Sequence, residues 1–436
     1  MPVRRERKIR MKLRRLDPAE HGKTRRLWEE VFSDDTKAFL DYYYYIKTRD
    51  NAIYVIEEDG EICSMLQLNP YTVRVEGQEF PSAYIIAVAT RKEYRSRGYM
   101  GALLRTSLKE MYSRGLPFTF LMPAAEAIYT PYDFRYIYSQ YRGTLICGER
   151  DGGIYWKSEG DSPAHFEIQS EVKAAELGED RRGDVLFSDA GLWDAEELSV
   201  FFEEHFADRF QVCTVRDAAY YQTMILEQQS EKGGVRLIRR DGALKGFYAY
   251  AGEEGLEIRE PLFLPGYEKD FRMSVEELAD RIQAGQQRDA EQQGDTGQKK
   301  GAGQQEIPVY ACPSEYADRR KPLIMARIVS LRKLLSALKV PEEESVDCSF
   351  AVIDPLITEN SRVWKLTSGI GETELHVGET EDSEGDLPVA DFTELIFGQV
   401  TPEELSGRES VILTEHLAGE FKKITRLSRV CFNEIV

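Results

Sequence analysis

The stretch from Ala83 to Gly115 reads AYIIAVATRKEYRSRGYMGALLRTSLKEMYSRG and changes character twice. An apolar run with two isoleucines is followed by arginines around Gly98, and then by leucines and a methionine at helical spacing. This order predicts a strand, a basic glycine loop and an amphipathic helix. The first N–H groups of a helix lack partners within the helix and carry partial positive charge, so an anion such as a pyrophosphate fits at this junction. Gly98 allows close backbone approach, and Arg95 and Arg97 add charge.

The glycine pattern by itself leaves two interpretations open. The loop either binds an anion, or carries glycine and arginine only for geometry and solubility. Two other phosphate loops are excluded by pattern, because the chain has no GxxxxGK[ST] and no GxGxxG followed by an acidic residue about 20 positions later.

Length and composition limit the protein class. A chain of 436 residues with 42% hydrophobic content is long enough for two or three domains with sizeable cores. A net charge of −19 argues against nucleic acid as a partner. No apolar run approaches the roughly 18 residues of a membrane span, and MPVRRERKIRMKLRR at the start lacks the apolar core of a signal peptide. We therefore expect a cytoplasmic protein.

The six cysteines are far apart, with no CxxC spacing and no histidine in ligand register. We expect reduced thiols and no structural metal. The cysteines are Cys63, Cys147, Cys213, Cys312, Cys348 and Cys431.

The elements before and after the glycine loop alternate in type. Turn signals at Asp59-Gly60 and Glu76-Gly77 divide residues 52–89 into strands of an antiparallel meander. The predicted order is β-α-β-β-β-loop-α-β-α-β. Its further elements are a strand at 10–17, a helix at 18–32, a strand at 117–123, a short helix at 124–134 and a strand at 135–147.

This order, the R-x-x-G-x-x-G loop and the later IYTPYDF together resemble the GNAT superfamily of acetyl-CoA-dependent N-acetyltransferases over about the first 150 residues. The usual family loop has a small residue where Met100 stands, and Gly101 comes one position later. A bulky residue there is typical of one branch, the Eis (enhanced intracellular survival) acetyltransferases. The length, a second α/β region and the final RVCFNEIV agree with that branch.

The resemblance implies where acetyl-CoA binds. Its pantetheine arm would lie between the fourth and fifth strands, along the backbone of Val88, Ala89 and Thr90. Packing in the core is compatible with this role, because the backbone of these residues makes the contact. The pyrophosphate would accept hydrogen bonds from backbone N–H groups, with Arg95 and Arg97 near the phosphates. The N–H groups are those of Ser96, Arg97, Gly98, Tyr99, Met100 and Gly101.

Acetyl transfer to an amine needs a group that protonates the departing thiolate. Tyrosine is the usual acid in this family, and Tyr129 matches the family position. The Eis branch uses an aromatic residue five positions later, where a gap-free match gives Phe134, which cannot donate a proton. A small local shift would put Tyr136 there instead, so both tyrosines are candidates. A strand with aromatic residues on both faces is the alternative interpretation of this segment.

The acceptor amine must also lose a proton. The resemblance implies that the base is the C-terminal carboxylate, here the main-chain carboxylate of Val436, threaded from the last domain into the first. The apolar residues CFNEIV suit a buried strand. Glu434 and Glu126 are the alternative bases.

Residues 151–317 continue the α/β character without an R-x-x-G junction and look like a degenerate second GNAT-like domain. A Gln/Gly-rich segment at 284–305 is predicted to be a mobile surface insertion. Residues 318–436 begin with IMARIVSLRKLLSALKV, which predicts a helix with one apolar face. This region resembles the sterol-carrier-protein-like domain that closes Eis chains. The face consists of Leu331, Leu334, Leu335 and Leu338.

The expected fold class is therefore α/β (α+β), with a GNAT fold at 1–150, the second GNAT-like domain at 151–317 and the sterol-carrier-protein-like domain at 318–436. We expect an N-acetyltransferase that moves acetyl from acetyl-CoA to an amine by direct transfer in a ternary complex, because nothing near Cys63 or Cys147 would activate a thiol. The negative chain favours a cationic acceptor, such as a polyamine, an aminoglycoside or a lysine side chain. The resemblance implies a hexamer. The alternative is a non-catalytic lipid or small-molecule carrier that uses the C-terminal domain.

Overall fold

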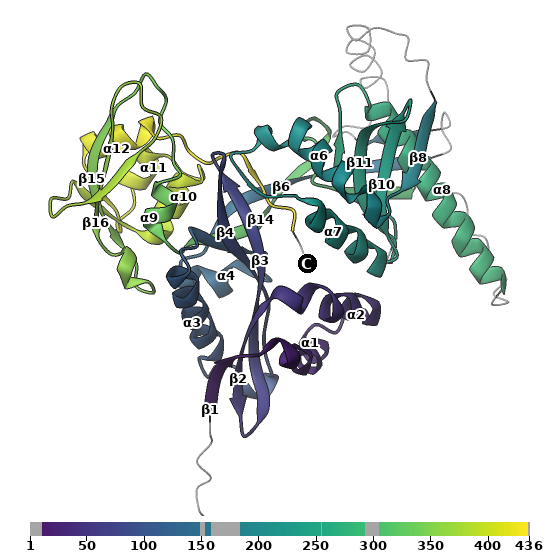
Figure 1. Cartoon of the computed structure of the whole chain (residues 1–436), viewed down its shortest axis with the longest axis horizontal. Helices are drawn as coiled ribbons and strands as arrows, with labels where there is room; N and C mark the ends of the chain where they lie inside the picture. The colour runs from purple at the N-terminus through teal and green to yellow at the C-terminus, as the bar shows by residue number, and fades with distance from the viewer. Residues whose placement is uncertain (1–10, 149–152, 158–183, 254, 293–304, 435–436) are drawn as a thin grey trace, which may run out of the picture. The chain divides into compact units, whose positions relative to one another are not determined.

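The structure is a computed structural model, which describes residues 11–148, 153–157, 184–253, 255–292 and 305–434 (Figure 1). The chain forms two compact units. The first contains Met1–Ser139, Ala207–Val215 and Pro322–Val436, and the second contains Gln140–Phe206 and Arg216–Lys321. Among the described helices, none is both long and apolar enough to cross a membrane.

The N-terminal part of the first unit is a sheet in the order β1-β2-β3-β4-β5-β14. The strands from β1 to β4 pair antiparallel, β5 runs parallel to β4, and β14 is antiparallel to β5. Helix α3 lies on one side of β2 and β3, and α1 and α2 lie on the other (Figure 1). The elements are β1 (Met11–Arg15), α1 (Arg25–Val31), α2 (Lys37–Tyr45), β2 (Ala52–Glu58), β3 (Glu61–Val75), β4 (Gln78–Thr90), α3 (Tyr99–Ser113), β5 (Phe118–Leu121), α4 (Glu126–Tyr129) and β14 (Arg319–Ile328).

Both predicted hairpin turns of the meander are confirmed. Asp59 and Gly60 have φ of 50° and 91°, and Glu76 and Gly77 have φ of 45° and 81°. Two successive left-handed residues make the turn whose twist matches that of the paired strands. The turns therefore set the register that brings β4 beside β3.

Helix α2 is absent from the predicted order, which corrects the sequence analysis. The hydroxyl of Thr36 accepts a hydrogen bond from the backbone N–H of Phe39 at 3.3 Å and caps its first turn. Four successive tyrosines from Tyr42 onward show no clear helical period. Tertiary packing stabilises the helix instead, because the Trp28 and Tyr43 rings lie 4.6 Å apart between α1 and α2.

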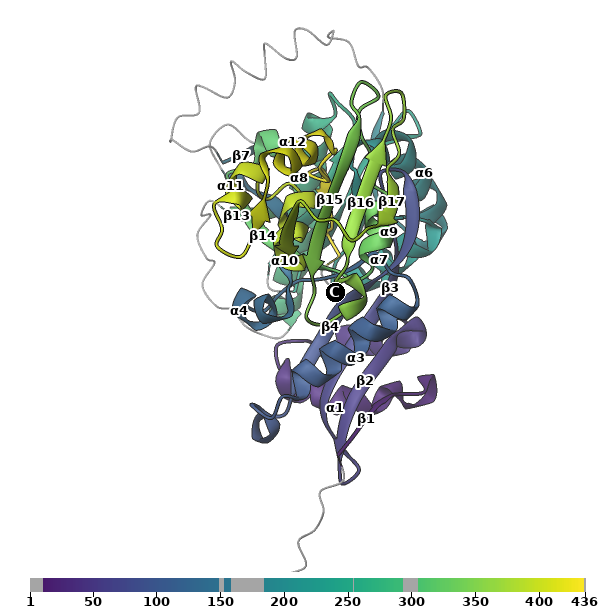
Figure 2. The same ribbon diagram turned by 90° about the vertical axis from the view of Figure 1, so that its left-hand side faces the viewer.

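The C-terminal part of the first unit is a second sheet, in the order β17-β16-β15-β18-β19, with helices packed against it. Figure 2 shows the long strands β15 and β16 of this sheet side by side. The elements are α9 (Leu331–Leu335), β15 (Val346–Ile353), β16 (Val363–Ser368), β17 (His376–Glu379), β18 (Gly385–Pro388), α10 (Val389–Ile396), α11 (Pro402–Ser406), β19 (Ile412–Leu413) and α12 (Glu415–Lys423).

The helix predicted over residues 324–340 is shorter than expected. Residues 324–328 belong to β14, and α9 contains only Leu331–Leu335. The four leucines of the predicted apolar face are nevertheless fully buried. The apolar run I-M-A-R-I-V pairs with β5, so strand pairing overrides the helical spacing there.

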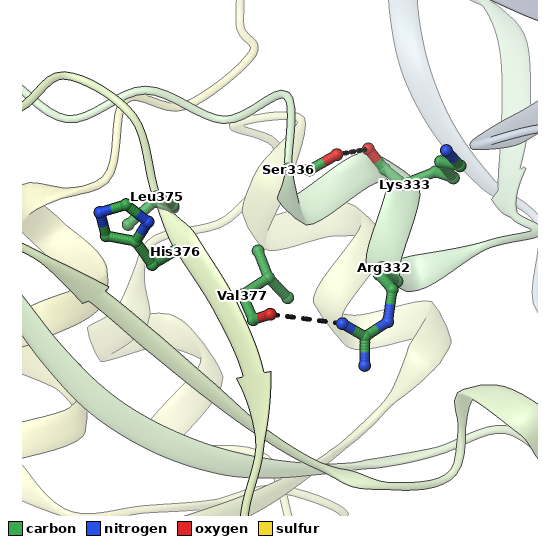
Figure 3. Close-up of a pocket in the computed structure, with 6 residues that line it drawn as sticks. All are labelled: Arg332, Lys333, Ser336, Leu375, His376 and Val377. Atoms are coloured by element: carbon green, nitrogen blue, oxygen red, sulfur yellow. Dashed lines mark hydrogen bonds between the residues drawn. The ribbon is translucent and has the colours of Figure 1, made fainter.

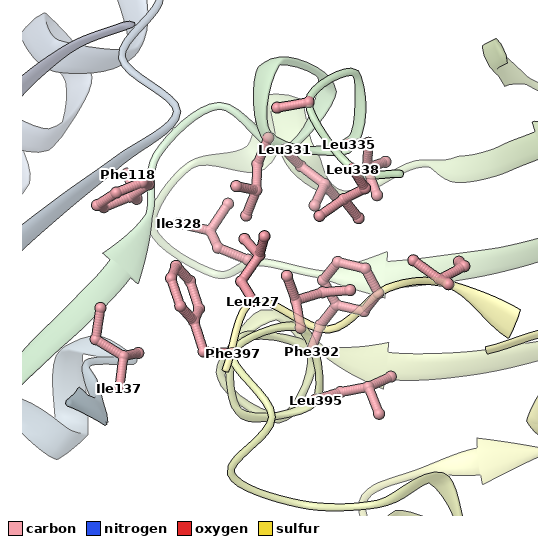
Figure 4. Packing of buried hydrophobic residues seen from close by; sticks show 14 of the residues in the cluster. Phe118, Ile137, Ile328, Leu331, Leu335, Leu338, Phe392, Leu395, Phe397 and Leu427 are labelled. Carbon is pink, nitrogen blue, oxygen red and sulfur yellow. The ribbon is translucent and has the colours of Figure 1, made fainter. Parts of the chain in front are cut away.

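The two parts of the first unit share one hydrophobic cluster. Phe397 of the C-terminal part lies edge-on to Phe118 of β5, with ring centroids 5.6 Å apart, and Figure 4 shows it pointing toward Phe118 and Ile137. Phe432 stacks on Phe120 at 4.4 Å. The C-terminal part is therefore packed directly on the strand that borders β4.

From β8 to β13, the second unit repeats the order of helices and strands that the first unit has from β1 to β5. Its sheet has the order β8-β10-β11-β12-β13-β6-β7, and β13 runs parallel to β12 as β5 does to β4. The elements are β6 (Arg135–Gly148), β7 (Gly153–Trp156), β8 (Val185–Asp189), α6 (Ala195–His205), α7 (Ala218–Ser230), β10 (Gly234–Arg240), β11 (Ala243–Ala251), β12 (Glu257–Phe263), α8 (Glu268–Gln292) and β13 (Gln305–Tyr310).

The insertion predicted at 284–305 needs a correction at both ends. Helix α8 continues through Gln292, and Gln305 already belongs to β13. Glutamine, glutamate and alanine are good helix formers, so the polar composition does not prevent an extended helix here. Residues 293–304 lie outside the described residues.

Candidate functional site

The glycine loop ends in a left-handed residue at the start of α3. Gly98 has φ 79° and ψ 11°, and it precedes Tyr99, the first residue of the helix. Ser96 is left-handed as well, with φ 62°. The N–H of Ala102 bonds to the carbonyl of Gly98 at 3.0 Å, and no side chain caps the helix start. The preceding N–H groups of the first turn have no partner within the helix, so they can bind an anion.

Both predicted arginines lie at this loop. The Arg97 guanidinium lies over the Tyr94 ring at 4.7 Å and approaches a carboxylate oxygen of Glu58 at 3.5 Å. Arg95 donates from Nε to the carbonyl of Thr90 at 3.2 Å. Arg97 is half exposed, and NH2 of its guanidinium also donates to the carbonyl of Glu93 at 3.1 Å. Turning toward an anion at the helix start would exchange only these contacts.

Two residues that the sequence analysis missed lie against Gly101. A β-carbon at Gly101 would come within 2.5 Å of the Tyr132 hydroxyl and 3.2 Å of an Arg105 guanidinium nitrogen. Glycine is therefore required for the approach of Tyr132. Arg105 adds a third cation near the first turn of α3. It stands four residues after Gly101, and residues at this spacing share one face of a helix, so the sequence could have indicated it. No pattern in the sequence indicates that Tyr132 lies there.

Strand β4 contains a bulge just before the loop. Gln67 of β3 pairs with Ile86 and Met65 pairs with Ala89, so β4 has one residue more than β3 between these pairs. The extra residue distorts the backbone, and Ala87 has φ 51°. Such bulges re-aim the strand and are frequent beside active sites.

Strands β4 and β5 pair only briefly. Their register contains the single pair Tyr84 and Phe120. Beside it, the Ser82 hydroxyl donates to the carbonyl of Phe118 at 2.9 Å, and Thr119 Oγ1 donates to the carbonyl of Ala83 at 2.7 Å. Within the described strands the pairing does not extend beyond Tyr84. The predicted segment Val88, Ala89 and Thr90 therefore has no partner strand on its β5 side.

The candidate acids lie in one hydrophobic cluster with the loop residues. Tyr129 is 7% exposed, its ring lies edge-on to Phe134 at 5.8 Å, and burial raises the pKa of Tyr129 to about 12. Tyr136 is half-buried, and burial together with the nearby Glu126 carboxylate raises its pKa as well. Phe134 is fully buried as a core ring. The cluster also contains Val88, Tyr99 and Met100.

The last described residues return to the N-terminal sheet. Strand β20 (Val430–Cys431) runs parallel to β9 (Val212–Thr214), which pairs with β3. The hydroxyl of Tyr138 donates to Asn433 Oδ1 at 2.8 Å. The predicted burial of the final segment is thus confirmed as far as Glu434. Val436 lies outside the described residues.

Glu434 is a buried carboxylate two residues beyond Phe432, which stacks on Phe120 of β5 at 4.4 Å. It is 5% exposed and accepts a hydrogen bond from the Thr214 hydroxyl. Burial raises the pKa of Tyr84, and Tyr71 and Glu434 add to the effect. Glu126, the other alternative base, is exposed in the first turn of α4.

The corresponding junction of the second unit has the opposite charge. Gly266, two residues before the start of α8, is left-handed with φ 82°. The first turn of α8, however, carries Glu268 and Asp270. Asp270 is held by Arg240 at 2.8 Å. Carboxylates at a helix start occupy the place of an anion, so this junction is unsuited to a phosphate.

A shallow hollow of about 350 Å³ lies between α9 and β17 in the C-terminal part (Figure 3). Arg332 donates to the carbonyl of Val377 at 3.3 Å, and Lys333 and His376 also line the hollow. The cationic side chains of Arg332 and Lys333 do not suit an acyl chain. Among the described residues, no group of three or more His, Cys, Asp or Glu side chains is arranged to hold a metal ion.

The family of the N-terminal part follows from its sequence together with this geometry. Residues 12–137 match the acetyltransferase (GNAT) domain family. The chain carries a GNAT acetyltransferase domain. Residues 331–433 match the sterol carrier protein domain family. No curated protein matches the chain.

Several solved structures have a similar fold over nearly the whole of this chain. A probable N-acyltransferase from Enterococcus faecalis has a TM-score of 0.71 and 16% identity, over 98% of this chain and 100% of that one. A GCN5-related N-acetyltransferase from Anabaena variabilis has a TM-score of 0.67 and 16% identity, over 97% of this chain and 98% of that one. Eis1 from Mycobacterium abscessus has a TM-score of 0.62 and 12% identity, over 98% of this chain and 100% of that one. The predicted Eis-like fold is therefore confirmed, whereas the three domain boundaries and the site residues stay predictions.

Proposed function

We propose that the protein transfers an acetyl group from acetyl-CoA to an amine by direct transfer in a ternary complex. One observation carries the proposal: the bulged end of β4, which has no partner strand on its β5 side, leads straight into the left-handed Gly98 loop and the uncapped start of α3. A pantetheine arm can pair with a strand edge, and a pyrophosphate can accept the helix N–H groups. Arg95, Arg97 and Arg105 supply charge for the phosphates.

The acid in this proposal is Tyr129 or Tyr136. Burial raises the pKa of Tyr129 to about 12, so its hydroxyl stays protonated at neutral pH and can donate to a departing thiolate. Burial also raises the thiol pKa of Cys63 and of Cys147, which supports direct transfer rather than a thioester on the enzyme.

The base is the carboxylate of Glu434 or, as the resemblance implies, the main-chain carboxylate of Val436. Extending the chain by a few residues beyond Val436 moves that second carboxylate away. If it is the base, turnover falls by about 10²-fold or more, whereas Val436→Leu stays active. An extended protein that works at the original rate, with unchanged acetyl-CoA affinity, removes this carboxylate from the mechanism.

The acceptor is an amine, and the net charge of −19 favours a cationic one by electrostatic steering. Polyamines, aminoglycosides and lysine side chains carry the required group. A hexamer and a cytoplasmic location remain predictions, of which light scattering tests the first.

A panel of these amines, assayed for free thiol in the presence of acetyl-CoA, tests the proposal. We expect thiol release that depends on the amine, with one acetyl group found on the amine for each thiol. When both substrate concentrations are varied, a ternary complex predicts intersecting lines in double-reciprocal plots of the initial rate. A covalent intermediate predicts parallel lines. Acyl-chain binding without turnover of any amine would support the carrier function instead.

A further inference from the structure

A fully buried arginine in β14 links three segments of the first unit. Arg327 is fully buried, and each of its three guanidinium nitrogens donates a hydrogen bond. Nε donates to the carbonyl of Tyr132 at 3.0 Å, and NH1 donates to the carbonyl of Ile328 at 2.6 Å. NH2 donates to Asp354 Oδ1 at 2.5 Å. The planar fork of arginine matches this set of acceptors, which a lysine ammonium cannot.

The Asp354 side of this link is held rigidly by the sterol carrier protein domain. Asp354 is 1% exposed, and its Oδ1 accepts the backbone N–H groups of Leu356 and Ile357 at 3.0 Å and 2.9 Å. Its Oδ2 accepts a hydrogen bond from Asn360 Nδ2 at 2.9 Å. These three hydrogen bonds hold the Asp354 carboxylate independently of Arg327, so it can anchor the link.

The other side of the link is the turn that joins α4 to β6. Tyr132 and Asp133 form this turn, and Asp133 is left-handed with φ 64°. The Asp133 carboxylate lies 3.6 Å from the Arg327 guanidinium. Tyr129 stands at the start of the same turn, and the Tyr132 hydroxyl lies against Gly101 in the first turn of α3. One guanidinium thus holds the backbone that carries both tyrosines.

We propose that Arg327 is a positioning residue that fixes Tyr129 for proton donation by tying its turn to Asp354 of the sterol carrier protein domain. The sterol carrier protein domain then acts as a brace for the acetyl-transfer site rather than as a carrier. The proposal rests on the proposed function, in which Tyr129 is a candidate acid. Misplacing a donor group by about 1 Å can lower a rate by about 10²-fold, so a brace of this kind matters for turnover.

Hydrogen exchange tests the brace without any need for activity. Arg327→Lys keeps the charge but loses the fork, and Asp354→Asn removes the anchoring charge without touching the turn. We expect both variants to exchange about 10-fold faster or more in a peptide covering residues 126–135, relative to the wild type. Arg240→Lys is the matched control, because Arg240 forms a partly buried bidentate pair with Asp270 in the second unit. It should leave that peptide unchanged.

Kinetics then test whether the brace acts through Tyr129. Arg327→Lys and Asp354→Asn should each lower kcat by about 10-fold or more, with a smaller change in KM for acetyl-CoA. In a Tyr129→Phe background, Arg327→Lys should cost little further activity, because the group it positions is already gone. A purely structural role would lower activity by the same factor in both backgrounds.

The outcomes separate the two proposals. Unchanged exchange at 126–135 in both variants overturns the brace. Faster exchange with equal kinetic losses in both backgrounds overturns the link to Tyr129. If the wild type turns over no amine, the proposed function fails, and the exchange result alone decides whether Arg327 holds the turn. If Arg327→Lys does not fold, Asp354→Asn carries both measurements.

Discussion

Replacing Gly98 by asparagine and by aspartate tests whether an anion binds at the start of α3. Gly98 is left-handed with φ 79°, a conformation that Asn and Asp adopt more readily than other residues. A β-carbon there meets no atom within 4 Å. Both substitutions therefore fit the loop, and they differ only in charge.

The expected difference can be worked from Coulomb's law. Two unit charges about 5 Å apart repel by about 0.8 kcal/mol in water and by about 3.3 kcal/mol at an effective dielectric constant of about 20. A diphosphate carries two such charges, so the lower limit is about 1.6 kcal/mol. Gly98→Asp should therefore bind acetyl-CoA at least about 10-fold more weakly than Gly98→Asn, since about 1.4 kcal/mol corresponds to a factor of ten.

The same pair of variants supplies its own stability control. A carboxylate at the start of a helix is favourable, by about 0.3 to 1 kcal/mol, so Gly98→Asp without ligand should be at least as stable to urea as Gly98→Asn. Calorimetric titration with acetyl-CoA measures the affinities. If the aspartate variant is folded and binds as tightly as the asparagine variant, the pyrophosphate does not lie at this helix start.

Three further sets of substitutions test the acid, the base and the packing of the loop. Changing the true acid among Tyr129 and Tyr136 to Phe should lower kcat by about 10²-fold with little change in donor affinity, and full activity of the double variant would remove tyrosine from the mechanism. Glu434→Gln should lower kcat by a similar factor if this carboxylate is the base, and an unchanged rate would exclude it. Gly101→Ala should lower the free energy of unfolding by about 1 to 3 kcal/mol, because its β-carbon would lie 2.5 Å from the Tyr132 hydroxyl. Tyr132→Phe in the same chain should restore most of that loss in urea unfolding, and no recovery would contradict the packing.

The glycine loop could be predicted from sequence because its chemistry is local. A glycine between a β-branched run and a leucine-rich run marks a left-handed turn at a helix start, and Gly98 adopts that conformation. The bulge in β4 could not be predicted, because its left-handed residue is Ala87, and alanine does not signal such a conformation. The left-handed turn at the start of α3 could therefore be predicted, because it depends on one glycine.

The contacts made by distant segments could not be predicted. Arg327 stands in the apolar run I-M-A-R-I-V, and nothing nearby indicates that it is buried. Its partners Tyr132 and Asp354 are 195 and 27 residues away in sequence. Glu434 and Thr214 meet across 220 residues through the pairing of β20 with β9. Such placements depend on the packing of the whole unit, which a local pattern does not encode.

A crystal structure of the protein with acetyl-CoA tests the central claim most directly. We predict the pyrophosphate within hydrogen-bond distance of the backbone nitrogens of Tyr99, Met100 and Gly101. The pantetheine arm should lie along Val88–Thr90, and the thioester should lie beside Tyr129. Acetyl-CoA bound at another place, such as the hollow between α9 and β17, with the start of α3 free, would contradict the account.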